Sequence, residues 1–165
     1  MEAHRRATAL RTESRSAPSP WEQWPPAILR AVSEEKTELV RLHFQCFNAG
    51  DVDGLLDLFS EDAVVETDAR FPEGGVFEGR AALRRLYEGF HEGWEGGSVA
   101  EIARMAEAPG NVVLVDFVWR GTGDASRIET RNEISGLWSV RAGRITRVRY
   151  FFERDEALAA AGLEG

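Results

Sequence analysis

Four side chains in this sequence could exchange protons with a bound ligand: His43, Glu66, Asp68 and Tyr150. The imidazole of His43 can transfer a proton near neutral pH or donate a hydrogen bond to a developing oxyanion. Glu66 and Asp68 are the best candidates for a general base, because a carboxylate at a cavity rim has few solvent contacts and a raised pKa. With Tyr150 orienting the ligand, these residues predict cofactor-free proton transfer at a carbon next to a carbonyl, as in isomerisation or aldol-type cyclisation.

The same residues also have a structural interpretation. His43 falls on the apolar stripe of a predicted helix, where a core histidine bonds a backbone carbonyl or a carboxylate. Glu66 and Asp68 precede a loop that contains Pro and Gly, and solvent could surround them there. The alternative to an enzyme is therefore a non-catalytic ligand-binding or scaffold protein. An enzyme should place an ionisable group with a shifted pKa in an open pocket, whereas a scaffold should have a filled cavity.

The walls of the predicted cavity come from residues 127–152, two alternating strands around an RAGR turn. If Tyr150 points inward, Val148 and Phe152 do so too, because side chains alternate along a strand. The same register on the neighbouring strands turns six further residues inward: Arg131, Glu133, Ser135, Leu137, Phe117 and Trp119. An aromatic cup with a few polar groups is typical of a site for a small hydrophobic, oxygen-bearing molecule.

Two alternatives remain open for these strands. The aromatic residues could simply fill the core, and Arg131 with Glu133 could form either an ion pair in the pocket wall or an exposed cross-strand pair. By the same register the outer face of the sheet carries Leu114, Val118, Ile134, Trp138 and Phe151. An apolar outer face needs a cover, so a homodimer through this face is predicted.

Helices and strands that would position these residues follow from periodicity and capping signals. A helix is predicted from Ser33 to Gly50 and a second short helix after Asp51, because Ser and Asp cap helices and Gly ends them. The remaining elements are a strand over 63–67, a helix over 80–93, strands over 98–107 and 112–119, the hairpin, and a helix over 153–163. Segregated helices and an antiparallel meander predict an α+β domain.

Composition bounds the protein further. The chain has 165 residues and 43% apolar content, which suits one domain, assigned to residues 31–165 behind a flexible tail over 1–30. A net charge of −8 opposes nucleic acid as a partner. No apolar run is long enough for a membrane span, no secretory signal is evident, and Cys46 has no disulfide partner, so a cytoplasmic location is predicted.

No metal or cofactor is predicted. His91, Glu92 and Glu95 lie close together in the sequence, but Gly93 and Trp94 interrupt the spacing and no second histidine is nearby. Sequence motifs for nucleotides, phosphates or activated nucleophiles are also missing.

Three phrases carry a resemblance to a known family: FNAGDVDGLLDLFSEDAVVE at 47–66, FEGRAALRRLY at 77–87 and SVRAGRITRVRYFFERDEAL at 139–158. With the order of elements, they resemble the SnoaL-like branch of the nuclear transport factor two-like superfamily over residues 34–163. The resemblance implies a cone-shaped, curved, antiparallel or mixed sheet that wraps around three helices as an α+β barrel. It also implies a pocket at the wide mouth and a dimer through the outer sheet face.

The superfamily includes ketosteroid isomerase, polyketide cyclases, limonene-epoxide hydrolase and proteins without a reaction, so the fold alone does not choose a function. The resemblance places the isomerase's oxyanion-binding tyrosine at His43, its base near Glu66–Asp68 with Thr67 in a gapless register, and its protonated aspartate at Ser135. The epoxide hydrolase positions hold Val115, Phe117 and Tyr150. The cyclase pattern, one carboxylate or histidine in an apolar cavity, is the one this chain satisfies.

Overall fold

A computed structural model describes residues 33–71 and 73–163. The predicted tail over residues 1–30 lies outside the described residues. The elements in chain order are α2 (Glu34–Ala49), α3 (Val52–Leu56), β1 (Phe59–Thr67), β2 (Gly75–Glu78), α4 (Arg80–Gly89), β3 (Val99–Ala108), β4 (Val112–Thr122), β5 (Glu129–Arg141), β6 (Arg144–Phe151) and α5 (Arg154–Ala160). No helix in the described part of the chain is long and apolar enough to cross a membrane.

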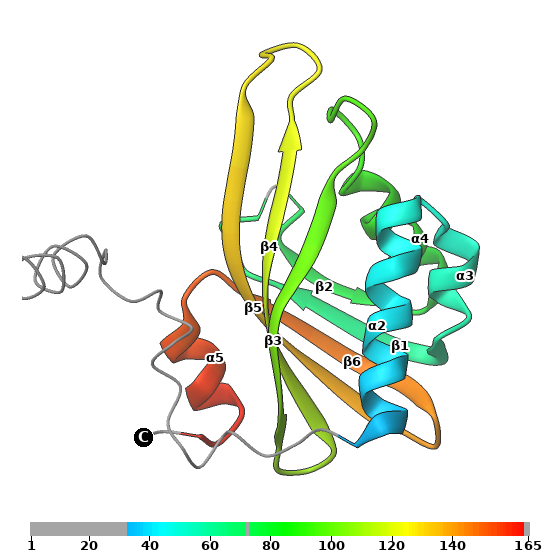
Figure 1. The fold of residues 1–165 in the computed structure, drawn as a ribbon. Helices are drawn as coiled ribbons and strands as arrows, with labels where there is room; N and C mark the ends of the chain where they lie inside the picture. The colour runs from blue at the N-terminus through cyan, green and yellow to red at the C-terminus, as the bar shows by residue number, and fades with distance from the viewer. Residues whose placement is uncertain (1–32, 72, 164–165) are drawn as a thin grey trace, which may run out of the picture.

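One six-stranded sheet, in the order β2-β1-β6-β5-β4-β3, organises the domain. All neighbouring strands are antiparallel except β1 and β6, which are parallel. The sheet curves around α2, α3 and α4, and α5 lies on its other side (Figure 1). The predicted α+β class is confirmed, but the sheet is open rather than a closed barrel, because β2 and β3 are unpaired edges within the described residues.

The two N-terminal helices begin and end where their caps predict. The Ser33 side chain accepts a hydrogen bond from the backbone N–H of Lys36, and Gly50 takes the left-handed conformation that ends α2, with φ of 70°. The Asp51 carboxylate then accepts from the backbone N–H of Gly54 and starts α3. Glu34 and Glu35 in the first turn of α2 complement the helix dipole.

Several boundaries differ from the sequence-based prediction. The largest differences are at β1, which starts at Phe59 rather than at residue 63, and at α4, which ends at Gly89 rather than at residue 93. Strand β4 extends to Thr122 rather than to residue 119, and α5 ends at Ala160 rather than at residue 163. The sequence predicts a loop in place of the short strand β2, because its four residues, GVFE, show no alternation of apolar and polar side chains. In the structure these residues are mostly exposed. It pairs with β1 and forms one edge of the sheet.

A β-bulge in the last hairpin changes which face β5 presents. Val140 pairs with Ile145, whereas Ser139 pairs with Arg147, so Thr146 is an additional residue on β6. An uninterrupted hairpin would pair Ser135 with Tyr150, but the bulge pairs Gly136 with Tyr150 and Ser135 with Phe151. Because a shift of one residue turns every following side chain to the other face, the predicted orientation of β5 is wrong.

The corrected register exchanges the two faces of β5. Ile134 and Trp138 point into the main core between the sheet and α2, α3 and α4, not to the outer face. Leu114 and Phe151 belong to the outer cluster beneath α5, and Val118 is on the same outer face of β4. The inward positions of Arg131, Glu133, Ser135 and Leu137 are therefore wrong, whereas those of Phe117, Trp119, Val148 and Tyr150 are confirmed.

Candidate functional site

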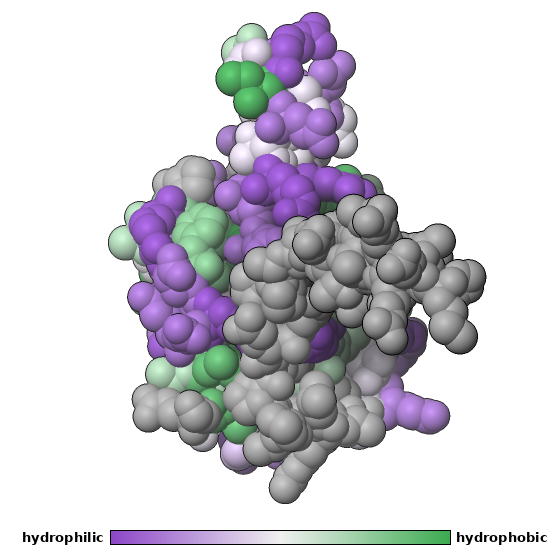
Figure 2. All heavy atoms as spheres, turned by 60° about the vertical axis from the view of Figure 1, so that its left-hand side comes forward, coloured by the Kyte–Doolittle hydropathy of each residue, from purple (hydrophilic) through white to green (hydrophobic). Residues whose placement is uncertain are grey.

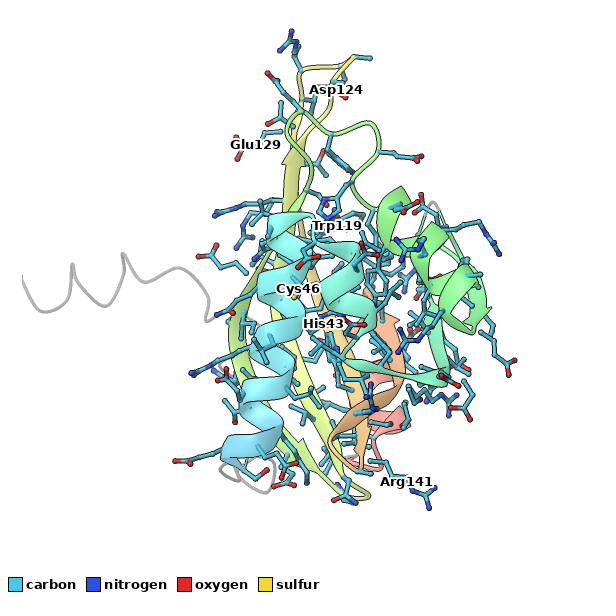
Figure 3. The ribbon with its side chains drawn as sticks, turned by 90° about the vertical axis from the view of Figure 1, so that its right-hand side faces the viewer. His43, Cys46, Trp119, Asp124, Glu129 and Arg141 are labelled. Atoms are coloured by element: carbon cyan, nitrogen blue, oxygen red, sulfur yellow. The ribbon has the colours of Figure 1, made fainter. Side chains whose placement is uncertain are left out.

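A small apolar cavity lies between α2 and the inner face of the sheet. Its volume of about 30 Å³ gives room for about two water molecules. Figure 3 shows His43 beneath α2, with Trp119 placed between His43 and the end of the molecule that carries Asp124. The lining consists of aromatic rings and a few other side chains: His43, Phe44, Phe47, Phe71, Phe90, Ala100, Phe117, Trp119, Ile134 and Tyr150.

Three lining side chains carry a polar atom, His43, Trp119 and Tyr150, although the surface of the cavity itself is apolar. A further side chain, Tyr87, connects His43 to Tyr150. The Nε2 atom of His43 is 3.3 Å from the hydroxyl of Tyr87, and that hydroxyl is 2.9 Å from the hydroxyl of Tyr150. The side chains of His43, Tyr87 and Tyr150 are buried. Helix α2, helix α4 and strand β6 thus each contribute one member to a continuous hydrogen-bonded chain, which begins and ends at the cavity.

Burial keeps every member of this chain uncharged near neutral pH. Loss of hydration lowers the pKa of His43 to about 3, so the imidazole is neutral. Burial raises the pKa of Tyr87 and of Tyr150 above the ordinary value for a phenol. Neutral phenols donate hydrogen bonds, so the chain can offer a donor to a ligand oxygen without a charge in the cavity.

Aromatic rings fix the orientation of the His43 imidazole. The rings of Phe44, Phe59, Tyr87 and Trp138 meet it edge to face, at centroid distances of 5.4 to 5.7 Å. The second ring nitrogen, Nδ1, is buried and has no hydrogen-bond partner among the described residues. An unsatisfied buried nitrogen costs free energy, and this one belongs to a side chain that lines the cavity.

Neither carboxylate predicted as a base reaches the cavity. Glu66 points to the outer face of the sheet, where its oxygens lie 2.7 Å from Arg147 and 2.8 Å from Arg149. Asp68 lies on the loop after β1 and pairs with Arg70 at 2.7 Å, and hydrogen bonds from Arg70 lower the pKa of Asp68 to about 2. The expected increase in the pKa of Asp68 is therefore wrong, and no carboxylate lines the cavity among the described residues.

The polar residues predicted on β5 lie on the opposite face. Ser135 is buried there and donates a 2.6 Å hydrogen bond to Asp116 of β4. Arg131 and Glu133 form a pair at 3.3 Å with side chains that are 57% and 38% exposed. The pair therefore lies at the surface and not in the pocket wall, but both residues are on β5, so it is not a cross-strand pair. Phe117, Trp119 and Tyr150 do line the cavity, and Phe152 lies just outside it against Phe71.

Tyr87 and Phe71 were not predicted as site residues. Tyr87 is on the apolar stripe of α4, so the sequence places it in the core, but it gives no sign that its hydroxyl would meet a histidine 44 positions earlier. Phe71 is in a loop, where periodicity gives no information about burial. His91 is occupied elsewhere, because its Nδ1 accepts a hydrogen bond from the backbone N–H of Ser98. No cluster of three metal-ligating side chains occurs in residues 33–71 and 73–163.

Comparisons with known proteins agree with this architecture. A family model described as a SnoaL-like domain matches residues 40–148. No curated protein matches the sequence. A protein of Catenulispora acidiphila with a ketosteroid isomerase-like fold, solved in complex with trimethylamine, has 20% identity and a TM-score of 0.63, with 77% of this chain and 94% of that chain covered.

Two further solved structures carry names that refer to an activity. The epoxide hydrolase/cyclase-like enzyme SalBIII, from pyran ring formation in salinomycin, has 25% identity and a TM-score of 0.60, with 73% and 92% of the two chains covered. A putative polyketide cyclase of Sinorhizobium meliloti has 24% identity and a TM-score of 0.55, with 69% and 94% covered.

Proposed function

Because the chain belongs to the SnoaL-like domain family, we propose that it binds a small, apolar, oxygen-bearing molecule in the cavity beneath α2. The Tyr150 hydroxyl is the donor to the ligand oxygen, and Tyr87 and His43 hold that hydroxyl in place. The observation that carries this proposal is the composition of the lining: aromatic rings on nearly all sides, with the hydrogen-bonded side chains of His43 and Tyr150 among them.

The chemistry of the lining favours capture over proton abstraction from carbon. A neutral phenol and a neutral imidazole can donate to a carbonyl oxygen and stabilise negative charge that develops on it. Removal of a carbon-bound proton needs a base as well, and the imidazole, with a pKa of about 3, is a weak one. Glu66 and Asp68 are held by arginines away from the cavity.

Acid-assisted isomerisation or cyclisation of a bound carbonyl compound is the second candidate. It is favoured by the buried chain of hydroxyl groups and by the likeness to the salinomycin enzyme and the polyketide cyclase. In this reaction Tyr150 polarises the ligand oxygen and the rings of Phe117 and Trp119 hold the carbon skeleton. The predicted homodimer through the outer sheet face would leave this cavity unchanged, and it stays a prediction.

A pair of isosteric ligands tests the binding proposal. Cyclohexanone and methylenecyclohexane have similar shapes, but only the ketone accepts a hydrogen bond. We expect the wild-type protein to bind the ketone about fivefold more tightly, since one buried hydrogen bond contributes about 1 kcal/mol. Titration calorimetry with Tyr150→Phe should show that this preference disappears.

The control variant changes an aromatic residue at a site away from the cavity. Phe77→Ala on β2 is such a variant, because Phe77 is half-buried and does not line the cavity. It should keep the preference for the ketone. Equal binding of the ketone and the hydrocarbon by the wild-type protein, or a preference that survives Tyr150→Phe, would contradict the proposal.

A further inference from the structure

Aromatic rings close the cavity at one end of the sheet, which we call the mouth. Strands β1, β6 and β4 end there, and β5 and β3 begin there. The hairpin between β4 and β5, which carries Asp124, projects from the body as a mainly hydrophilic extension (Figure 2). The rings at this end belong to Phe71, Phe90, Trp94, Trp119 and Phe152. The opposite end is filled by core residues such as Phe59 and Ile145.

Backbone hydrogen bonds fix one wall of this mouth. Trp94 pairs with Gly123 beyond β4, and the Glu95 N–H donates to the Thr122 carbonyl at 2.7 Å. A side chain at Gly121 would collide with the Trp94 ring, because its Cβ would lie 2.8 Å from that ring. Gly121 therefore leaves room for the Trp94 ring, which meets Trp119 edge to face at 5.9 Å. This wall is part of the sheet.

Phe71 is attached to the mouth in a different way. It lies in the loop between β1 and β2, whereas the other lining residues belong to helices or strands or, like Phe90, directly follow a helix; yet Phe71 is only 5% exposed. Its ring stacks on Phe152 at 4.4 Å and on Trp119 at 6.1 Å. The preceding residue, Arg70, forms ion pairs with Asp68 and with Glu153, and the Arg70 and Glu153 side chains are at least half exposed. The exposed Arg70–Glu153 pair contributes little stability, whereas the Asp68 side chain is only 14% exposed. The Phe71 N–H donates to the Asp68 carbonyl within the same loop, so no strand pairing has to break when Phe71 moves, in contrast to the opposite wall.

We propose that Phe71 is the size-determining residue of the ligand site: its ring occupies the outer part of the site, and a ring-sized ligand binds by displacing it. The remaining cavity holds about two water molecules, which is too small for a six-membered ring. Ligand and Phe71 therefore compete for contact with Trp119, Phe90 and Tyr150. This inference rests on the proposed function, because it concerns the ligand class and the cavity assigned above.

Truncation of the ring tests the competition. Phe71→Ala removes a six-membered ring from the site, so cyclohexanone should bind at least tenfold more tightly than to the wild-type protein, as measured by titration calorimetry. Phe77→Ala, the same truncation away from the cavity, should leave the affinity within threefold of the wild-type value. If Phe71→Ala does not unfold cooperatively in urea, Phe71→Leu replaces it, with a smaller expected increase. An unchanged or weaker affinity overturns the proposal.

Proteolysis gives a readout that does not depend on affinity. Trypsin can cleave the Arg70–Phe71 bond only when this segment leaves the mouth, so saturating cyclohexanone should accelerate that cleavage in the wild-type protein. The Arg141–Ala142 bond, in the turn at the far end of the molecule in Figure 3, is the internal control and should be cleaved at the same rate with and without ligand. Ligand binding that slows cleavage at Arg70, or leaves it unchanged, overturns the proposal.

A double variant separates this inference from the proposed function. If Phe71→Ala binds cyclohexanone tightly and Phe71→Ala/Tyr150→Phe loses the preference for the ketone over methylenecyclohexane, both proposals hold. If neither the wild-type protein nor Phe71→Ala binds the ketone, the proposed function fails. If both bind it with equal affinity and the preference depends on Tyr150, the proposed function holds and the role of Phe71 is refuted.

Discussion

Replacement of His43 by glutamine should change how the stability of this protein depends on pH. The folded protein buries a neutral imidazole, and loss of hydration lowers its pKa from 6.5 to about 3. The unfolded chain binds a proton at His43 near pH 6.5, whereas the folded protein does not until about pH 3. Acid therefore favours the unfolded state, and the free energy of unfolding falls as the pH decreases from 6.5 toward 3.

The size of the effect follows from the two pKa values. One proton taken up only on unfolding changes the free energy of unfolding by about 1.4 kcal/mol per pH unit. Proton uptake at His43 should therefore lower the free energy of unfolding by about 2–3 kcal/mol as the pH falls from 6.5 to 4.5. Urea unfolding of the wild-type protein and of His43→Gln, at half-unit steps over this interval, measures the difference. Glutamine keeps a hydrogen-bonding group near Tyr87 and does not titrate.

Other titrating groups contribute equally to the stability of the wild-type protein and of His43→Gln, so their contributions cancel in the comparison. His91 also has a pKa lowered by burial and contributes with the same sign, but it is present in both proteins and cancels. Asp68, with a pKa lowered to about 2 by Arg70, contributes stability that is lost only as the pH falls below about 3.8, outside the interval. If His43→Gln loses as much stability between pH 6.5 and 4.5 as the wild-type protein does, the buried neutral imidazole is refuted.

Three further predictions concern stability and can be checked by urea unfolding. Tyr87→Phe removes the central hydroxyl of the chain and should lower the free energy of unfolding by about 1–2 kcal/mol, while Tyr87→Leu should lower it further because packing is lost as well. Gly136→Ala places a methyl group against the buried ring of Trp138 and should cost about 1–3 kcal/mol; an unchanged stability would contradict the inward position of Trp138. Deletion of Thr146 removes the β-bulge and should abolish cooperative unfolding, whereas Thr146→Ala, which keeps the chain length, should cost less than about 1.5 kcal/mol; a folded deletion variant would contradict the register.

Features that depend on near neighbours in the chain were predictable from the sequence. The caps at Ser33 and Asp51 and the left-handed Gly50 follow from side chains within a few residues, and they set the limits of α2 and α3. The apolar stripes of α2 and α4 place His43 and Tyr87 in the core, and both are buried. The alternation in β4 and β6 places Phe117, Trp119 and Tyr150 on the inner face for the same reason.

The tertiary structure alone decided which polar groups share the cavity. The bulge at Thr146 has no distinctive signature in the sequence, yet a shift of one residue moves Ser135 to the outer face, where it meets Asp116. Glu66 and Asp68 are only a few residues before Phe71, which lines the cavity, but arginines hold both carboxylates outside it. The hydrogen bonds that link His43, Tyr87 and Tyr150 join residues that are far apart in the sequence. The burial that shifts the pKa values of these three side chains depends on packing from all sides, which the local sequence does not encode.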